Sequence, residues 1–266
     1  MPIRLIASDL DGTLLKDDGT VSPRTRAALA RAAALGIAIV LVTGRPPRWV
    51  RDMPALTGAH AEVVCANGAL LYDVDAHAII EHAPLSCALA VELVDALRAT
   101  ARGSTFACEM AFRFGRDTDY QPRMPPADEL VGDVRDMVAA IPATKLIVRD
   151  DLIEHDALVA AVRHVVRGRA EVTHSGFGIV EISAPGVDKA HGLRAACARH
   201  GVALADTVAF GDMPNDIPML VRAGLGVAVA NAHADVRAIA NEITASNEDD
   251  GVARVIERLL GSRSPG

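Results

Sequence analysis

Two aspartates stand two residues apart where the first apolar run of the chain ends. Residues 3–10 predict a buried strand, and Asp9 and Asp11 lie at its end, followed by Gly12 and Thr13. In α/β proteins, ligands bind beyond the carboxyl ends of such strands. Two like charges at that place need something to hold them. We therefore expect a divalent cation and a reaction that uses one carboxylate as nucleophile and the other as acid and base.

Three further polar groups stand where predicted strands end or a predicted helix begins. Thr43, Gly44 and Arg45 follow the apolar run 37–42, and Lys189 opens a predicted helix. The last group is the run Gly211-Asp212-Met213-Pro214-Asn215-Asp216, which follows a short predicted strand at 207–210.

In this order and spacing, the four groups resemble the motifs of the haloacid dehalogenase (HAD) superfamily. Its members are mainly Mg²⁺-dependent phosphatases with a Rossmann-like core and a movable cap. The resemblance covers the whole chain, and the first and last motifs are specific even when taken alone. It implies an α/β fold with a parallel-sheet core over 1–82 and 186–266, and an inserted α+β cap over 83–185. The insertion point and residues 181–189 are most similar to the Cof-type, sugar-phosphate phosphatase-like subfamily.

The resemblance also assigns catalytic roles that are chemically reasonable. Asp9 is the nucleophile that forms an aspartyl-phosphate, and Asp11 protonates the leaving oxygen and then deprotonates water. Thr43 offers a hydroxyl to a phosphate oxygen, and Lys189 places a positive charge beside the phosphoryl group. Asp11 also favours phosphoryl transfer over dehalogenation, because a halide leaving group needs no proton.

The same resemblance predicts the binding residues and the cofactor, which is Mg²⁺. The substrate is a small phosphorylated metabolite, such as a sugar phosphate. The expected phosphate-binding and substrate-binding residues are Leu10, Gly44, Arg45 and Asn215. The expected metal ligands are Asp9, Asp11, Asp212 and Asp216, and carboxylate oxygens suit this hard cation.

Two other functions agree with these motifs. A phosphomannomutase-like phosphotransferase would return the phosphoryl group to a second hydroxyl, and nothing in residues 83–185 selects it. A non-catalytic sensor of a phosphorylated ligand would be expected to have lost Asp9, Asp11, Lys189 or Asp212, and all four are present.

Several residues have simpler interpretations. Asp11 and Asp216 are also common residue types for turns and helix caps, and Thr13 is interpreted as a hydroxyl that supports its turn. Arg45 is interpreted equally well as a substrate contact or as a solvated side chain. Asn67 is interpreted as a turn residue rather than as part of the site.

Selectivity is expected to come from cap side chains that face Asp9. The candidates lie in 105–114, which has strand character. Glu109 and Arg113 interrupt its apolar residues, and we favour solvent exposure for both. Asp188 departs from the Cof-type pattern, which has a small residue there. An acid beside Lys189 either changes the local charge or points outward.

Strand and helix signals support the two-part organisation. Ser22 and Pro23 predict the start of a helix over 24–35, with Gly36 at its end, so that residues 3–42 form a strand–helix–strand unit. Residues 171–174 and 178–183 predict a hairpin in the insert. The remaining predicted strands cover 62–66, 143–148 and 225–229, and the remaining predicted helices cover 85–99, 153–166, 189–200, 217–223, 232–241 and 252–260.

The composition excludes other classes of protein. The formal net charge of −7 over 266 residues argues against a nucleic-acid binder. No apolar run approaches the ~20 residues of a membrane span. The four cysteines have no C-x-x-C spacing, and the nine histidines form no zinc pattern. We therefore expect a cytoplasmic protein with reduced thiols, and the sequence does not predict an oligomeric state.

Overall fold

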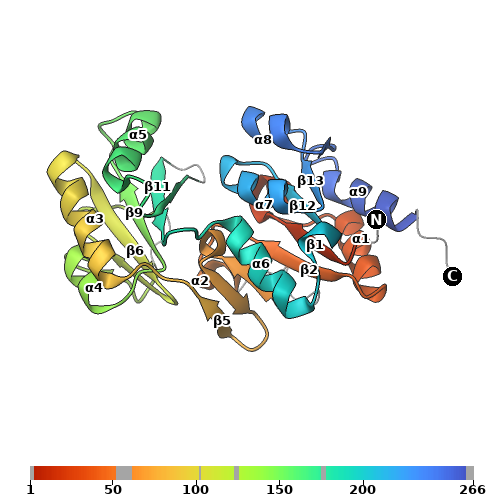
Figure 1. Ribbon diagram of the computed structural model, residues 1–266, viewed down its shortest axis with the longest axis horizontal. Helices are drawn as coiled ribbons and strands as arrows, with labels where there is room; N and C mark the ends of the chain where they lie inside the picture. Colours follow the sequence, from red (N-terminus) through yellow and green to blue (C-terminus); the bar gives the residue numbers. More distant parts are fainter. Residues whose placement is uncertain (1–2, 52–61, 102, 123–125, 175–177, 262–266) are drawn as a thin grey trace.

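The computed structural model describes residues 3–51, 62–101, 103–122, 126–174 and 178–261, and these residues contain two β-sheets (Figure 1). The first sheet has the order β14-β13-β12-β1-β2-β3-β4-β5. Its strands are parallel from β14 to β3, and β4 and β5 extend it antiparallel. Its strands are β1 (Leu5–Ser8), β2 (Ala38–Val42), β3 (Glu62–Cys65), β4 (Leu70–Asp73), β5 (Ala78–His82), β12 (Thr207–Gly211), β13 (Leu225–Ala228) and β14 (Glu242–Ile243).

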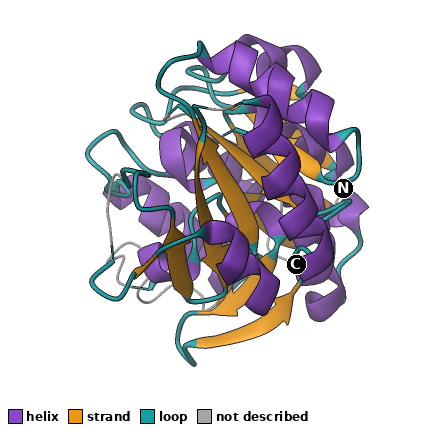
Figure 2. Ribbon diagram, turned by 90° about the vertical axis from the view of Figure 1, so that its left-hand side faces the viewer, coloured by secondary structure: helices purple, strands orange, loops and turns teal. Residues whose placement is uncertain are grey.

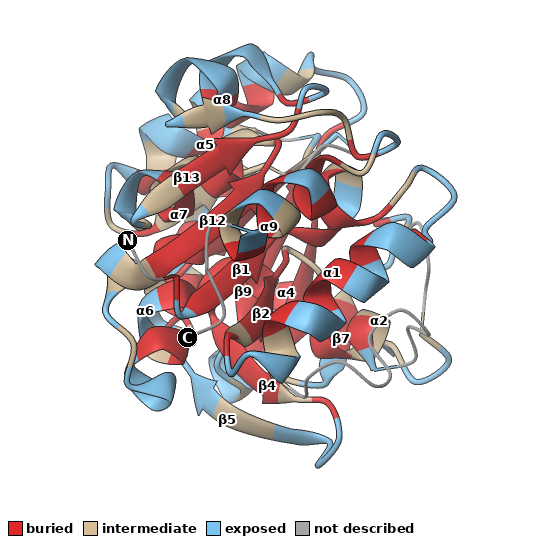
Figure 3. Ribbon diagram, turned by 90° about the vertical axis from the view of Figure 1, so that its right-hand side faces the viewer, coloured by how far each residue is buried: buried red, intermediate tan, exposed pale blue. Residues whose placement is uncertain are grey.

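Helices cover both faces of this sheet, and the alternation of side chains along β1 separates the two cores. Ile6 packs in a cluster with α1 (Pro23–Ala34) and α9 (Gly251–Gly261). Leu5 and Ala7 point the other way, into a cluster with α6, α7 and α8. The central strands are buried, whereas the outer faces of α1 and α8 are exposed (Figure 3). The helices that pack with Leu5 and Ala7 are α6 (Lys189–His200), α7 (Ile217–Arg222) and α8 (Ala234–Ile239).

The start of α1 agrees with the signals in the sequence. The Ser22 hydroxyl accepts a hydrogen bond from the Thr25 amide at 3.0 Å, so that it satisfies one of the free N–H groups of the first turn. Pro23 occupies the first helical position, and Gly36 follows the helix with a φ of +75°. The predicted helix is therefore confirmed, and it returns the chain to β2 beside β1.

The second sheet has the order β10-β11-β9-β6-β7-β8, and its pairs are antiparallel except for β7 with β8. One face packs against α3 (Cys87–Thr100), α4 (Val134–Ala140) and α5 (His155–Val166). Figure 2, viewed from this end of the molecule, shows strands flanked by helices. The second sheet and these three helices are called the cap below. Its strands are β6 (Thr105–Met110), β7 (Arg113–Arg116), β8 (Leu130–Val131), β9 (Lys145–Arg149), β10 (Glu171–Thr173) and β11 (Ile179–Ser183).

The predicted fold class is confirmed: a Rossmann-like parallel-sheet core with an inserted α+β cap. The strand character expected for 105–114 is confirmed, and it is divided between two strands. Ala111 adopts a left-handed φ of +56°, so that β6 turns back into β7. The antiparallel strands β4 and β5 and the helix α4 were not predicted. β10 and β11 do pair as a hairpin, although its connecting residues 175–177 lie outside the described residues.

Among the described residues, no helix is long and apolar enough to cross a bilayer.

Candidate active site

The site lies at the carboxyl ends of three neighbouring parallel strands. Asp9 directly follows β1, Thr43 follows β2, and Asp212 follows β12. β1 pairs with both β2 and β12, which brings their ends to one edge of the sheet. A hydrogen bond from the Asp9 amide to the Phe210 carbonyl, 3.0 Å long, continues the pairing of β1 and β12 one residue further. Parallel pairing therefore brings together residues that are far apart in the sequence.

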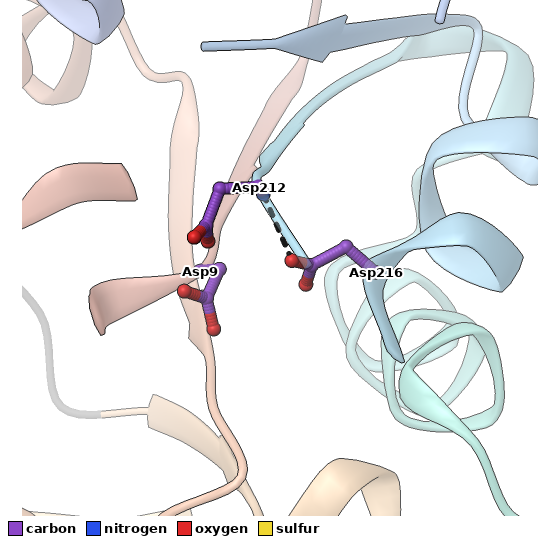
Figure 4. Close-up of side chains that lie close together, drawn as sticks. All are labelled: Asp9, Asp212 and Asp216. Carbon is purple, nitrogen blue, oxygen red and sulfur yellow. Dashed lines mark hydrogen bonds between the residues drawn. The ribbon is translucent and has the colours of Figure 1, made fainter. Parts of the chain in front are cut away.

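Three carboxylates and one ammonium group form the centre of the site. Asp9, Asp212 and Asp216 are buried, and each offers an oxygen within 4.8 Å of the others (Figure 4). The Lys189 Nζ atom donates to Asp9 Oδ1 and to Asp216 Oδ1, each at 2.6 Å. Lys189 is the first residue of α6 and is 1% exposed. Its charge is therefore directed entirely at the carboxylates.

Burial and crowding shift the pKa values in this cluster. Removal from water raises the pKa of Asp9 well above its usual range, and the neighbouring Lys189 only partly opposes this rise. The pKa of Asp212 rises to about 6, because burial and the charge of Asp216 both disfavour its ionised form. Burial would lower the pKa of Lys189, but Asp216 and Asp9 outweigh this effect and raise it. The carboxylates thus hold charge that their surroundings do not fully balance.

Backbone amides and glycines position the two acids of the last motif. One oxygen of Asp216 accepts hydrogen bonds from the amides of Asp212 and Met213, each at 3.0 Å. The Thr13 hydroxyl donates to Asp212 at 2.8 Å, in agreement with a supporting role for this residue. Gly12 has a φ of +74°, and a Cβ atom there would lie 2.6 Å from an Asp212 carboxylate oxygen. Only glycine fits this close approach.

The donor set fits Mg²⁺. Three carboxylates and one ammonium group carry a charge of −3 + 1 = −2, which a divalent cation neutralises. The donors are hard oxygen atoms, which Mg²⁺ prefers. The side chain of Asp11, which we expected among the metal ligands, does not belong to this group. Its carboxylate turns outward and is held elsewhere.

Asp11 pairs with Arg45 at the mouth of the site. The guanidinium of Arg45 donates to both oxygens of Asp11, at 2.8 and 2.5 Å. The Asp11 side chain is 50% exposed, so it has access to water and to an entering ligand. Arg45 is therefore not merely solvated, because it orients the predicted acid and base. The Thr43 hydroxyl oxygen accepts from the Arg45 amide at 3.1 Å, which leaves its own proton for another acceptor.

The predicted binding residues Leu10 and Asn215 differ in where their side chains lie. The Leu10 side chain is buried in the hydrophobic core, so only its backbone can contact a ligand. Asn215 is buried, and its Nδ2 donates to Asn67 Oδ1 at 3.0 Å. Asn67 is a turn residue with a φ of +55°, as predicted, but it also belongs to the site. The signal for a role of Asn67 in the site was its left-handed backbone conformation, because such a conformation in a non-glycine residue is often functional.

Charged side chains of the cap also reach the core, and sequence reasoning placed one of them wrongly. Glu109 is buried and pairs with Arg48, so the expected solvent exposure is incorrect. Arg113 is exposed, as expected. Lys145 and Glu181 form a buried pair beside Asn67, and neither was identified in the sequence.

Asp188 has a structural role. Its carboxylate accepts from the amide of His191 at 2.7 Å and caps the N-terminus of α6. This contact fixes the first turn of the helix that carries Lys189.

Residues 6–256 match the family model of the haloacid dehalogenase-like hydrolases. The chain belongs to this family. Pyridoxal phosphate phosphatase YbhA of Escherichia coli is 29% identical over 269 residues, which cover 96% of this chain and 98% of that protein. The 5-amino-6-(5-phospho-D-ribitylamino)uracil phosphatase YitU of Bacillus subtilis is 32% identical over 271 residues, with 96% and 97% covered. The family and its phosphatase relatives identify this chain as a phosphoric monoester hydrolase.

A solved structure agrees with the fold. BT1666 of Bacteroides thetaiotaomicron, from a study of phosphatases of this superfamily, has a TM-score of 0.82. Its sequence is 23% identical, and the match covers 97% of this chain and 96% of that one. The architecture therefore persists where most side chains differ.

Proposed function

We propose that this HAD hydrolase removes phosphate from a small phosphorylated metabolite, a sugar phosphate or a similar ester, with Mg²⁺ as cofactor. The observation that carries the proposal is the buried cluster of Asp9, Asp212 and Asp216 around Lys189. Asp9, Asp212 and Asp216 would hold the Mg²⁺ ion, which would offset part of the carboxylate and phosphate charge.

The first half-reaction transfers the phosphoryl group to the protein. An oxygen of Asp9 forms a bond to phosphorus while the bond from phosphorus to the ester oxygen breaks. Asp11, in its protonated form, gives its proton to that ester oxygen, and the alcohol leaves. Lys189, the Thr43 hydroxyl and the amide of Asn215 are the proposed contacts of the phosphoryl oxygens.

The second half-reaction releases the phosphate. Asp11 takes a proton from a water molecule, whose oxygen then forms a bond to phosphorus. The bond between phosphorus and Asp9 breaks, and inorganic phosphate and the free carboxylate result. Because Asp11 is half exposed, it is accessible to water and to the leaving group.

The test measures phosphate release from phenyl phosphate with and without Mg²⁺. We expect Asp9→Asn to lower the rate at least about 10³-fold, because the amide cannot act as the nucleophile. Asp75→Asn removes an exposed carboxylate between β4 and β5 and should leave the rate unchanged. Removal of divalent cations with a chelator should also abolish release.

Full activity of Asp9→Asn would refute the proposed mechanism. Phosphoryl transfer to a second sugar hydroxyl without phosphate release would support the mutase alternative instead.

The proposed partners are small metabolites and not nucleic acid. The free state of all four cysteines supports a cytoplasmic location.

A further inference from the structure

The cap carries a buried row of charged side chains that the proposed chemistry does not use. Glu109 on β6, Lys145 on β9 and Glu181 on β11 are 2%, 3% and 1% exposed. Their neighbours Cys108 and Leu146 pack in the cluster formed with the cap helices. Because side chains alternate along a strand, the charged row lies on the opposite face of the sheet.

This row contacts the two loops that are proposed to bind phosphate. The Lys145 Nζ atom donates to the carbonyl oxygen of Gly44 at 2.9 Å, next to Thr43. The side-chain amide of Asn67 donates to Glu181 at 3.1 Å and accepts from Asn215 at 3.0 Å. A continuous chain of hydrogen bonds thus runs from both phosphate loops to the cap.

Structural stability alone does not explain these charges. A buried ion pair often stabilises a fold no more than well-packed apolar side chains do, because both charges lose their hydration. Lys145 with Glu181 and Arg48 with Glu109 nevertheless place two such pairs between the cap and the core. The first of these pairs contacts Gly44 and Asn67, which adjoin the proposed phosphate contacts Thr43 and Asn215.

On the basis of the proposed phosphatase function, we propose that Lys145 and Glu181 recognise the leaving group. The geometry points to an uncharged polyhydroxyl chain, bound next to the phosphate. A hydroxyl both donates and accepts, so it can bridge an adjacent carboxylate and ammonium group. Two of the three N–H donors of Lys145 have partners among the described residues, which leaves one for a ligand.

The charge balance of these four described side chains argues against a second anion on the preferred substrate. Lys145 is matched by Glu181 and Arg48 is matched by Glu109, so that their formal charges sum to 2 − 2 = 0. These four side chains therefore carry no surplus positive charge for a second phosphate or a carboxylate, which would have to displace an existing partner. Asn67 acts as a positioning residue, because it holds Glu181 and Asn215 together.

The first test compares three esters: ribitol 5-phosphate, pentyl phosphate, which has no free hydroxyl, and 6-phosphogluconate, which has a carboxylate. We expect kcat/KM of the wild-type protein for ribitol 5-phosphate to exceed both others at least tenfold. A preference for pentyl phosphate or for 6-phosphogluconate would overturn the proposal.

The second test measures the ratio of kcat/KM for ribitol 5-phosphate to that for pentyl phosphate. Lys145→Met and Glu181→Gln should lower this ratio at least tenfold. The double variant Lys145→Met/Glu181→Met, which leaves no unpaired buried charge, should lower it as well. Arg135→Met removes an exposed cation from α4 of the cap and should preserve the ratio. An equal loss for both esters would instead show that the pair only joins the cap to the core.

A binding measurement separates this proposal from the proposed function. Calorimetry with Asp9→Asn protein and Mg²⁺ reports the affinity for ribitol 5-phosphate without turnover. Adding Lys145→Met should weaken that affinity at least tenfold, and an unchanged affinity would refute the recognition role. If wild-type protein releases phosphate from no ester, including phenyl phosphate, the proposed function fails, whereas the binding result still decides the role of Lys145.

Discussion

Single side chains in the candidate site are arranged for chemistry rather than for stability. Asp212 and Asp9 are buried beside another carboxylate, and both have raised pKa values for that reason. Lys189 balances only part of this charge. Bringing these ionised carboxylates together in a buried place is therefore expected to cost stability.

Asp212→Asn should stabilise the metal-free protein at neutral pH. The pKa of this carboxyl rises from 3.8 to about 6 on folding, so the folded state favours the protonated form. The stabilising contribution of that proton is fully present below pH 3.8 and is lost as the pH rises through about 6. The variant should therefore match the wild-type protein near pH 4 and exceed its free energy of unfolding well above pH 6 by about 3 kcal/mol.

Denaturant unfolding in the presence of a chelator, from pH 4 to pH 8, measures this difference. The exposed control Asp75→Asn should show no such pH-dependent gain. A variant that is less stable than the wild-type protein at pH 7.5 would contradict the expected cost in stability. With Mg²⁺ added, only the wild-type protein should gain stability strongly, because the variant lacks one ligand.

At the scale of elements, α6 delivers Lys189 because its first turn is fixed from two sides. Asp188 caps the helix, and Gly68 in the turn after β3 packs directly against it. A Cβ atom at Gly68 would lie 1.9 Å from the Asp188 carbonyl oxygen. The turn and the helix therefore position the ammonium group jointly.

Gly68→Ala should destabilise the protein and lower its phosphatase activity. The φ of +100° and the contact with backbone atoms both oppose a methyl group, and we expect a loss of about 3 kcal/mol or more. Gly36→Ala is the matched control, since it has a φ of +75° but nothing within 4 Å of the new atom. It should lose only about 1–2 kcal/mol and keep its activity. Thermal unfolding and phosphate release measure both effects, and equal losses would contradict the role of the packing.

At the scale of the whole molecule, the cap sheet contacts helix α2 and two loops of the core beside the candidate site. The guanidinium of Arg48 lies 5.0 Å from the centre of the Phe114 ring and pairs with Glu109, so that α2 (Pro47–Val50) is joined to the cap. Lys145 and Asn67 add further contacts. Opening of the cap would break these contacts together, which couples ligand entry to the charged row.

Removing one partner of the Arg48–Glu109 pair should lower the free energy of unfolding more than removing both partners does. Arg48→Met leaves the buried carboxylate of Glu109 unpaired, and we expect a loss of about 3–5 kcal/mol. Arg48→Met/Glu109→Leu removes both charges and should recover most of that loss. Denaturant unfolding of the two variants and of Glu109→Leu completes the cycle, and additive losses would show that the pair is not coupled.

The local sequence was sufficient for the catalytic motifs and for the fold class. Apolar runs followed by Asp9, Thr43 and Asp212 predict buried strands that end in polar groups, and parallel pairing brings such ends together. The Asp11 side chain lies outside the carboxylate cluster and pairs with Arg45, and its expected place among the metal ligands stays a prediction. The residue limits of the two domains and the catalytic roles stay predictions.

Only the tertiary structure revealed how the cap contributes to the site. Lys145 contacts Gly44 across 101 residues of sequence, and Glu181 contacts Asn67 across 114. No local pattern encodes such pairs, because a charged residue on a strand looks the same whether it faces water or another sheet. The motifs around Asp9 and Lys189 were readable because phosphoryl chemistry demands particular groups at adjacent strand ends. The proposed surroundings of the leaving group depend instead on which loops of the core the cap sheet contacts, and contacts over such separations are decided only in the folded chain.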